Sequence, residues 1–263
     1  MENFSKVAFE KDLVRALGIE GGEATEDYLL AFLRKYFGEE QARKIRETVS
    51  QDLNFFRTLD PASANYTEMQ ILSVRRGMAA ITAHRIFDQI LSENPQLLYD
   101  IEVIAKYVQK DTNVEIHPSA KIGVPFAIDH GHGTVIGATA ELGKRAFIYH
   151  GVTLGASKER SKTQRRHPRV GDDAYFGNGS QVLGPVIMEN NVHLSCGVVV
   201  RDCYLRKGVR IALGVRVAEV IVPENILIVG SDDINLRRYA IKDKGSGKID
   251  WHEFETFVPG DYE

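Results

Sequence analysis

The sequence has few of the features that mark secreted, membrane or disulfide-rich proteins. Its two cysteines, Cys196 and Cys203, form neither a disulfide framework nor a CxxC pair. No run of about 18 apolar residues occurs, which excludes a membrane-spanning segment. The opening residues, MENFSKVAFEKDLVRALG, lack the basic and apolar regions of a signal peptide. We therefore expect a cytoplasmic protein that does not associate with membranes.

No charge of either sign dominates. The 33 Lys and Arg residues nearly balance the 36 Asp and Glu residues, and the formal net charge is -3 at pH 7. Proteins that bind nucleic acid usually carry a basic surplus, so we expect no nucleic-acid partner. At 263 residues the chain can form one or two domains with a full hydrophobic core.

The first part of the chain has the apolar spacing of helices. Apolar residues recur three or four positions apart, which is typical of helices with one buried face. Gly38 and the pair Asp60-Pro61 interrupt this pattern, as residues that end helices do. We expect an α-helical oligomerisation domain over residues 1–113. The predicted helices cover residues 25–38, 39–59, 67–91 and 96–109.

From residue 114 onward the period changes to six. An apolar residue recurs at every sixth position from Ile116 to Val200, with only two interruptions. This period matches neither a helix, at about 3.6, nor a strand, at about 2. It matches a hexapeptide solenoid, in which each hexad forms one face of a triangular coil. The repeated positions are Ile116, Ile122, Ile128, Ile136, Leu142, Ile148, Leu154, Val170, Phe176, Val182, Met188, Leu194 and Val200.

We expect this solenoid to cover residues 114–230, with a closing strand at 222–230. A charged tail, partly helical or disordered, is expected at 231–263. The tail sequence resembles the end of a calcium-binding loop, but Lys242 and Lys244 would occupy the first and third ligand positions of that loop. Calcium requires oxygen ligands there, so we predict no calcium site.

The first interruption adds two residues between Ile128 and Ile136 and contains the pair Asp129-His130 among glycines. Histidine can remove a proton near neutral pH, and a neighbouring carboxylate can orient the ring and stabilise its cation. The competing interpretation is a surface turn in which the glycines only permit a positive φ.

The second interruption adds ten residues to the repeat, within the segment ASKERSKTQRRHPR at 156–169. Such a charge run is either a solvated surface loop or an arm that brings Arg166 and His167 to an anionic group. Arginine suits a carboxylate because its planar fork can bind both oxygens. The basic residues are Lys158, Arg160, Lys162, Arg165, Arg166 and Arg169.

Together these elements resemble the serine O-acetyltransferases of the hexapeptide acyltransferase superfamily. The repeat indicates the superfamily, and the ordered motifs narrow it to the serine enzymes. The resemblance implies an α+β fold with an N-terminal α-helical domain followed by a left-handed parallel β-helix of hexapeptide repeats. The matching motifs are Asp60-Pro61-Ala62, Ala83-His84-Arg85-Ile86, Ile116-His117-Pro118-Ser119-Ala120-Lys121-Ile122-Gly123, Asp129-His130, Val152-Thr153-Leu154-Gly155 and Arg166-His167-Pro168.

The resemblance also implies a reaction and an assembly. The reaction is acetyl transfer from acetyl-CoA to L-serine, giving O-acetyl-L-serine for cysteine biosynthesis, with acetyl-CoA as co-substrate and no tightly bound cofactor. Proteins of this family form homotrimers, with active sites between neighbouring coils, and often pair trimers through the helical domain.

The family roles fall on named positions of this chain. The resemblance makes His130 the general base, places Asp60 and Asp129 on the substrate ammonium, and places Arg166 on its carboxylate. His167 completes the pocket as a catalytic and substrate-binding residue. No metal ligand is implied. The positions expected to bind acetyl-CoA are Ala156, Ser157, Asn178, His193 and Cys196.

Several positions depart from the family pattern. Glu115 stands where an aspartate normally orients the catalytic histidine, and His132 stands where threonine is usual. Coils from Cys203 to Val217 are additional, and Gly230-Ser231-Asp232-Asp233 replaces the usual G-x-P-A. The C-terminal isoleucine that docks into the sulfhydrylase is absent, so no sulfhydrylase complex is expected.

Three other functions remain open at this level. The first is acyl transfer to another hydroxyl, on a sugar or a different amino acid; the opposite charges of Asp60 and Arg166 favour an amino acid. The second is a zinc enzyme on the same fold, which needs three histidine ligands. The third is a non-catalytic scaffold. The candidate zinc ligands are His117, His130, His132, His150 and His167.

Overall fold

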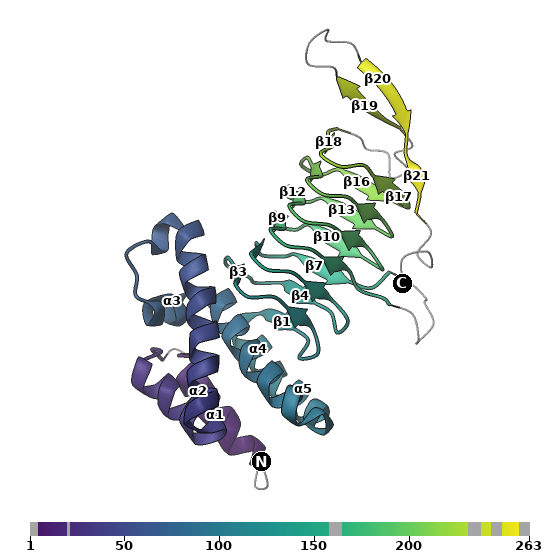
Figure 1. Cartoon of the computed structure of the whole chain (residues 1–263). Coiled ribbons are helices and arrows are strands. Elements are labelled where there is room, and N and C mark those ends of the chain that lie inside the picture. Colours follow the sequence, from purple (N-terminus) through teal and green to yellow (C-terminus); the bar gives the residue numbers. More distant parts are fainter. Residues whose placement is uncertain (1–4, 20–21, 158–164, 231–237, 243–248, 258–263) are drawn as a thin grey trace.

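The computed structural model describes the chain apart from residues 1–4, 20–21, 158–164, 231–237, 243–248 and 258–263. Figure 1 shows a bundle of helices beside a stack of parallel coils, with a hairpin at the far end of the stack. Several predicted features lie outside the described residues. They are Lys158, Arg160 and Lys162 of the basic loop, Lys244 of the segment that resembles a calcium-binding loop, Ser231-Asp232-Asp233, and the final residues of the chain.

The helices follow the predicted segments, with two differences. Gly38 has φ 74° and ψ 173°, which are not helical values, so α2 consists of two helices joined at a kink, as the predicted boundary at Gly38 requires. The first difference is helix α1, Lys6–Ala16, which no predicted segment covers. The helix predicted at 67–91 is broken at Arg75, whose backbone is extended (φ -104°, ψ 94°). The apolar spacing continues across this break and therefore gave no signal of it. The helices are α1 (Lys6–Ala16), α2 (Glu26–Leu59), α3 (Glu68–Val74), α4 (Arg76–Glu93) and α5 (Leu98–Thr112), with the 3-10 turns η1 (Pro61–Ser63) and η2 (Pro95–Leu97).

Local chemistry accounts for where these helices begin. The Thr25 hydroxyl accepts a hydrogen bond from the Tyr28 amide at the start of α2. A reciprocal capping box between Thr67 and Gln70 starts α3. Helix α4 is the central helix of the bundle, and every residue from 77 to 87 is buried.

Close approach of α4 to the coil depends on Gly77. A Cβ atom at this position would lie 2.5 Å from the carbonyl oxygen of Ile128, the last residue of strand β3 (Phe126–Ile128). Only glycine permits this distance. The first turn of α4 therefore packs directly against the end of β3, where the Asp129-His130 pair begins.

The last helix ends at Thr112 and the first strand begins at Val114. From there the chain winds through three parallel sheets, each hexad adding one strand. All repeated apolar positions except Ile122 are buried inside the coil. Sheet A contains β1 (Val114–Ile116), β4 (Thr134–Ile136), β7 (Thr153–Gly155), β10 (Gln181–Leu183), β13 (Val199–Arg201) and β16 (Arg216–Ala218).

The other two faces of the coil are built in the same way. Sheet B contains β2 (Lys121–Ile122), β5 (Glu141–Leu142), β8 (Arg169–Val170), β11 (Ile187–Met188), β14 (Tyr204–Leu205) and β17 (Val220–Val222). Sheet C contains β3, β6 (Ala146–Ile148), β9 (Tyr175–Phe176), β12 (His193–Leu194), β15 (Arg210–Ile211) and β18 (Leu227–Ile228).

The end of the chain differs from its prediction. The segment 222–230 is not one closing strand, because β17 ends at Val222 and β18 belongs to another sheet. The described part of the tail is strand and not helix. Strands β19 (Arg238–Lys242) and β20 (Ile249–Glu253) form an antiparallel hairpin, and β21 (Glu255–Thr256) pairs with β17. This antiparallel pairing covers the open edge of sheet B, a tertiary requirement that leaves no periodic signal.

Candidate active site

The three sheets meet at three corners, and the two interruptions of the repeat lie at different corners. The chain passes from β3 in sheet C to β4 in sheet A through residues 129–133. We call this edge of the coil the histidine corner; it also contains residues 149–152, 177–180 and 195–198. The chain passes from β7 in sheet A to β8 in sheet B through residues 156–168. We call this second edge the basic corner; it also contains residues 117–120, 137–140 and 184–186.

At the histidine corner, backbone hydrogen bonds hold the loop 129–133 at both ends. The amide of Asp129 donates to the carbonyl of Ile148 at 2.8 Å, and that of Gly133 donates to Asn113 at 2.8 Å. Between them His130 has a φ of 59°, the left-handed region that non-glycine residues rarely adopt. Seven other described non-glycine residues share this left-handed conformation, so the φ of His130 by itself does not distinguish a functional site from an ordinary turn.

This conformation presents the His130 imidazole to solvent. Its side chain is 55% exposed, whereas that of Asp129 is 14% exposed. The Nε2 atom of His130 lies 3.7 Å from Oδ2 of Asp129, within ion-pair range but too long for a hydrogen bond. The carboxylate is therefore placed to stabilise an imidazolium on His130.

Two further histidines lie beside this ring. The rings of His132 and His150 are stacked, with centroids 4.7 Å apart and planes 18° from parallel. The His150 ring is also nearly perpendicular to that of His130 at 5.6 Å. Burial lowers the pKa of His150, and the neighbouring His132 and His130 lower it further, against the opposing effect of Asp129. His150 is therefore neutral near pH 7.

Asp60 lies at the C-terminal end of α2. One carboxylate oxygen accepts from the Ala62 amide at 3.0 Å, and the other is 2.6 Å from the Ser63 hydroxyl and 2.8 Å from Nη2 of Arg75. Burial alone would raise the pKa of Asp60, but these hydrogen bonds and the Arg75 charge outweigh it, so the pKa lies below its usual value. Arg75 directly precedes α4, whose first turn packs on the loop 129–133.

At the basic corner, His167 is buried against a neighbouring turn. Its Nδ1 atom lies 2.8 Å from the Thr139 hydroxyl. A Cβ atom at Gly137 would lie 2.1 Å from Nε2 of His167, so only glycine leaves room for this ring. Burial lowers the pKa of His167, and the charges of Arg166 and other cationic neighbours lower it further, which favours the neutral imidazole.

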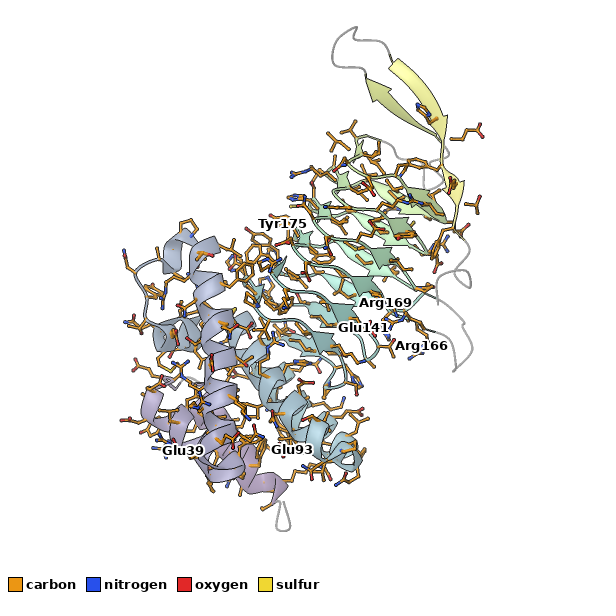
Figure 2. The ribbon with its side chains drawn as sticks, viewed as in Figure 1. Glu39, Glu93, Glu141, Arg166, Arg169 and Tyr175 are labelled. Atoms are coloured by element: carbon orange, nitrogen blue, oxygen red, sulfur yellow. The ribbon has the colours of Figure 1, made fainter. Side chains whose placement is uncertain are left out.

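The arginines of this corner differ in what they contact. Arg165 and Arg169 both bind the carboxylate of Glu141. Arg166 is exposed, and its guanidinium makes no ion pair with any described residue. Figure 2 shows Arg166, Glu141 and Arg169 along one edge of the coil, with Tyr175 along the opposite edge. Arg166 is thus the guanidinium available to an external anion.

The expected acetyl-CoA positions are divided between the corners. Asn178 and Cys196 occupy the histidine corner above His150, because the Gly179 amide bonds to His150 and the Gly197 amide to Asn178. Ala156 and Ser157 begin the loop of the basic corner, where the Ser157 hydroxyl donates to Asp202 at 3.0 Å. His193 lies on sheet C, and its ring stacks on Tyr175 at 4.1 Å.

The structure places Glu115 away from its expected partner. The Glu115 carboxylate accepts a hydrogen bond from the Gln109 side chain of α5 at 2.9 Å. With Glu102, Lys106 and His117 it lines a small cavity of about 110 Å³ between α5 and β1. Among the interactions of the described chain, none joins Glu115 to His130.

The structure therefore brings together Asp129, His130, His132 and His150. Among the interactions of the described residues, none joins Asp60 or Arg75 to these four side chains. The structure does not bring Arg166 and His167 to the same corner within one chain. Sequence reasoning named His150 only as a candidate zinc ligand and did not place it beside the proposed base. The sequence did contain a signal for its position. At this corner, the second residue after each buried apolar residue is followed by glycine, as in His150-Gly151 and Asn178-Gly179.

Within the described residues, no group of three or more His, Cys, Asp or Glu side chains has an arrangement that could hold a metal ion. Face-to-face stacking of His132 on His150 does not converge their nitrogens on one point, as a tetrahedral zinc site requires. None of the described helices combines the length and apolar character that a membrane crossing needs.

Comparison with known proteins shows similarity to one group of enzymes. No family model matches the sequence. The chain is 37% identical over 153 residues to the serine acetyltransferase of Bacillus licheniformis, covering 58% of this chain and 68% of that protein. It is 35% identical over 158 residues to the serine acetyltransferase of Staphylococcus xylosus, covering 60% and 70%.

Solved structures give the same result. The serine acetyltransferase of Neisseria gonorrhoeae matches with a TM-score of 0.60 at 27% identity, over 88% of this chain and 78% of that one. A structure of the Neisseria enzyme in complex with serine matches with a TM-score of 0.57. The predicted fold class, helices followed by a left-handed parallel β-helix of hexapeptide repeats, is confirmed. The chain belongs to the serine acetyltransferase family.

Proposed function

We propose that this protein transfers the acetyl group of acetyl-CoA to the hydroxyl of L-serine, giving O-acetyl-L-serine and CoA for cysteine biosynthesis. The observation that carries this proposal is the Asp129-His130 pair, held in an anchored loop with the imidazole exposed. The relatives are named serine acetyltransferases, and a Neisseria structure contains serine. The free thiols of Cys196 and Cys203 support a reducing compartment, the cytoplasm.

His130 acts as the general base in this reaction. It takes the proton of the serine hydroxyl as the serine oxygen attacks the thioester carbonyl carbon. Asp129, with its carboxylate 3.7 Å away, stabilises the resulting imidazolium. When the carbon–sulfur bond breaks, the imidazolium returns the proton to the CoA thiolate. No metal or tightly bound cofactor is needed for these steps.

The charges of the site suit an amino acid. Asp129 and Asp60 supply negative charge for the serine ammonium, and Arg166 supplies a planar fork for its carboxylate. The neutral His167 beside Arg166 closes the pocket without adding a competing charge. Glu115 is bound by Gln109 in this structure, and its proposed orientation of His130 requires a different side-chain conformation.

The division of the site between two corners supports a homotrimer or a dimer of trimers. Around a threefold axis, the histidine corner of one chain can face the basic corner of its neighbour, which unites His130 with Arg166. Acetyl-CoA then lies between the chains, with Asn178 and Cys196 on one side and Ala156 and Ser157 on the other.

Thiol release from acetyl-CoA tests the activity. We expect release with L-serine that exceeds release with L-homoserine, L-threonine or simple sugars. His130→Ala should lower kcat by about 10²–10⁴-fold, the usual contribution of a general base. A wild-type protein that shows no serine-dependent release would contradict the function, and a different preferred acceptor would identify the alternative acyltransferase.

Mixed oligomers test the shared site. His130→Ala and Arg166→Gln chains carrying different tags are co-expressed, and the species bearing both tags is purified. Each mixed trimer retains one interface with both intact corners. At a serine concentration far below the wild-type KM, where both parent proteins are nearly inactive, activity should therefore return to about one third of the wild-type value. Mixed trimers no more active than the parents would contradict a site built from two chains.

A further inference from the structure

We propose that Arg210 and Arg216 bind the phosphate groups at the nucleotide end of acetyl-CoA. This inference rests on the proposed acetyl transfer and assigns the residues that bind the charged end of its co-substrate. Both arginines lie in the additional coils from Cys203 to Val217, outside every position that the family resemblance connects with acetyl-CoA. The support comes from the direction open to the co-substrate, the length of its arm, and the charges along the histidine corner.

The helical bundle lies against one end of the histidine corner. Helix α4 packs directly on the loop that contains His130, because a Cβ atom at Gly131 would lie 3.1 Å from Cα of Gly77. From this loop the coil continues away from the bundle, toward β18 (Figure 1). The acetyl group must lie beside His130 during transfer. The rest of acetyl-CoA therefore extends along the corner toward the C-terminal coils.

Backbone hydrogen bonds connect the successive turns of this corner, which we call rungs. In each rung a glycine amide donates to a carbonyl of the preceding rung: Gly151 to His132, Gly179 to His150, Gly197 to Asn178 and Gly214 to Cys196. Leu213 therefore lies three rungs beyond His150. At about 4.8 Å for each rung, this separation is about 14 Å.

The arm of acetyl-CoA is long enough to reach the rung of Leu213. About 13 bonds separate its sulfur from the first phosphorus, and an extended chain advances about 3.3–3.6 Å for every three backbone bonds, so the arm spans about 15 Å. With the thioester beside His130 and the sulfur on the side of His150, the phosphates reach the rung of Leu213.

Two cations flank the corner at this rung. Arg210 begins β15 on sheet C and Arg216 begins β16 on sheet A, one on each side of Leu213. The flanking positions in register on the two preceding rungs are Tyr175 and His193 on sheet C, and Gln181 and Val199 on sheet A. Of these described positions, only the two arginines carry a permanent positive charge. An anionic group that extends along this corner therefore meets its first permanent cations at Arg210 and Arg216.

Neither guanidinium has an ion-pair partner among the described residues. Both side chains are exposed, whereas Arg201 on the same sheet as Arg216 is paired with Glu219 at 2.7 Å. Burial lowers the pKa of His193, and the charge of Arg210, next to it in register, lowers it further. A phosphate is the natural partner for such guanidinium groups, because their planar fork can bind two of its oxygens.

Leu213 supplies an apolar contact between the two charges. Its side chain is 73% exposed, although leucine is usually buried. Ligand sites combine apolar contact surface with a small number of placed polar groups. The adenine ring of the nucleotide can cover Leu213 while the phosphates bind Arg210 and Arg216.

Three acetyl donors separate phosphate recognition from the rest of the reaction. Acetyl-CoA carries every phosphate, acetyl-dephospho-CoA lacks the 3′-phosphate, and acetylpantetheine lacks the whole nucleotide. We expect Arg210→Gln and Arg216→Gln each to raise the KM for acetyl-CoA by about 10–100-fold, the equivalent of one charge-assisted interaction. Their kcat should change by no more than about twofold. With acetylpantetheine, the kcat/KM of both variants should equal that of wild type, and acetyl-dephospho-CoA should show a smaller loss than acetyl-CoA in at least one variant.

Arg206→Gln is the matched control. Arg206 is an exposed arginine of the same coil, but it lies between sheets B and C, over the ring of Tyr204 at 5.9 Å. Its loss removes the same charge and should leave the KM for acetyl-CoA within about twofold of wild type at about 0.15 M salt, where distant surface charges are screened.

Calorimetric titration with CoA alone gives a second measurement that needs no turnover. The Kd for CoA should rise in Arg210→Gln and Arg216→Gln and stay at the wild-type value in Arg206→Gln. Oligomer size and thermal melting are measured for each variant. The substituted side chains are exposed and make no ion pair with a described residue, so all three variants should assemble as wild type does.

The results that would overturn the inference are distinct from failure of the proposed function. A wild-type protein without serine-dependent thiol release contradicts the function, whereas the titration with CoA still tests the two arginines. An active wild type whose Arg210→Gln and Arg216→Gln variants keep the wild-type KM for acetyl-CoA contradicts only this assignment. Equal losses with acetyl-CoA and with acetylpantetheine would show that the arginines do not act on the phosphates.

Discussion

Asp52 of α2 and Arg85 of α4 form a buried, two-pronged ion pair that joins the helices to the first coil. Nε of Arg85 lies 2.8 Å from Oδ2 of Asp52, and Nη2 lies 3.2 Å from Oδ1. Arg85 also donates to the carbonyls of Ile122 and Gly123, and Asp52 accepts from the amide of Phe126 at 2.8 Å. This pair therefore positions strand β3, which leads directly into Asp129-His130.

We predict that Asp52→Ala lowers the free energy of unfolding by about 3–5 kcal/mol, because it leaves the Arg85 charge buried and unpaired. Urea unfolding measures the change. The matched control is Glu39→Ala, which removes the exposed partner of Arg34 near the base of the bundle (Figure 2). The control should unfold as wild type does. Equal midpoints for the two variants would contradict the role of the buried pair.

We predict that Gly137→Ala displaces the His167 ring, because the new Cβ would lie 2.1 Å from its Nε2 atom. A displacement of this size should lower kcat/KM by about 10²-fold. The same substitution in a His167→Ala background should have little further effect, since the clashing ring is absent. Steady-state kinetics of the four proteins gives this comparison, and additive losses would show that Gly137 acts elsewhere.

We predict that Arg166→Gln raises the KM for serine by about 10–100-fold, the equivalent of one charge-assisted interaction. The KM for acetyl-CoA should change much less. Arg169→Gln is the control, because Arg169 is bound to Glu141 on the same corner (Figure 2). Initial rates at varied serine concentration test this. A larger increase in the KM for serine with Arg169→Gln than with Arg166→Gln would show that Arg166 is not the residue that binds the serine carboxylate.

We predict that His84 makes the folded protein sensitive to acid. Burial, and then the charge of Arg85, lower the pKa of His84 to about 3, from 6.5 in the unfolded chain. Below pH 6.5 the unfolded chain binds a proton that the folded one does not, so stability falls as the pH falls. This group contributes at most about 1.4 kcal/mol per pH unit within that window.

The variant His84→Gln tests the assignment, because an amide can still donate to the carbonyl of Ala120 but does not titrate. Urea unfolding between about pH 7.5 and pH 5 should show a shallower pH dependence in the variant than in wild type. Identical slopes would mean that other groups, such as His150 and His167, account for the acid sensitivity.

Much of the site was visible in the sequence as departures from regularity. The Asp129-His130 and Arg166-His167 pairs stand where the six-residue period fails, and the structure places both pairs at corners of the coil. Three successive hexads make one turn of the coil, so the number of hexads between the two interruptions would also have shown that they lie at different corners. The break at Arg75 had no such signal, because its extended backbone is associated with a contact to Asp60, the residue that follows helix α2.

The sequence by itself determined the coil and its chemistry-bearing interruptions. A three-sided coil turns every sixth side chain inward, and all of the repeated apolar positions except Ile122 are buried. Only the tertiary structure decided which side chains meet. His132 and His150 stack because successive rungs lie in register, Glu115 turns to Gln109 because α5 packs beside β1, and Arg166 remains apart from His130 because each corner faces a different direction. These contacts depend on the spacing of the coils in three dimensions, which a one-dimensional pattern does not specify.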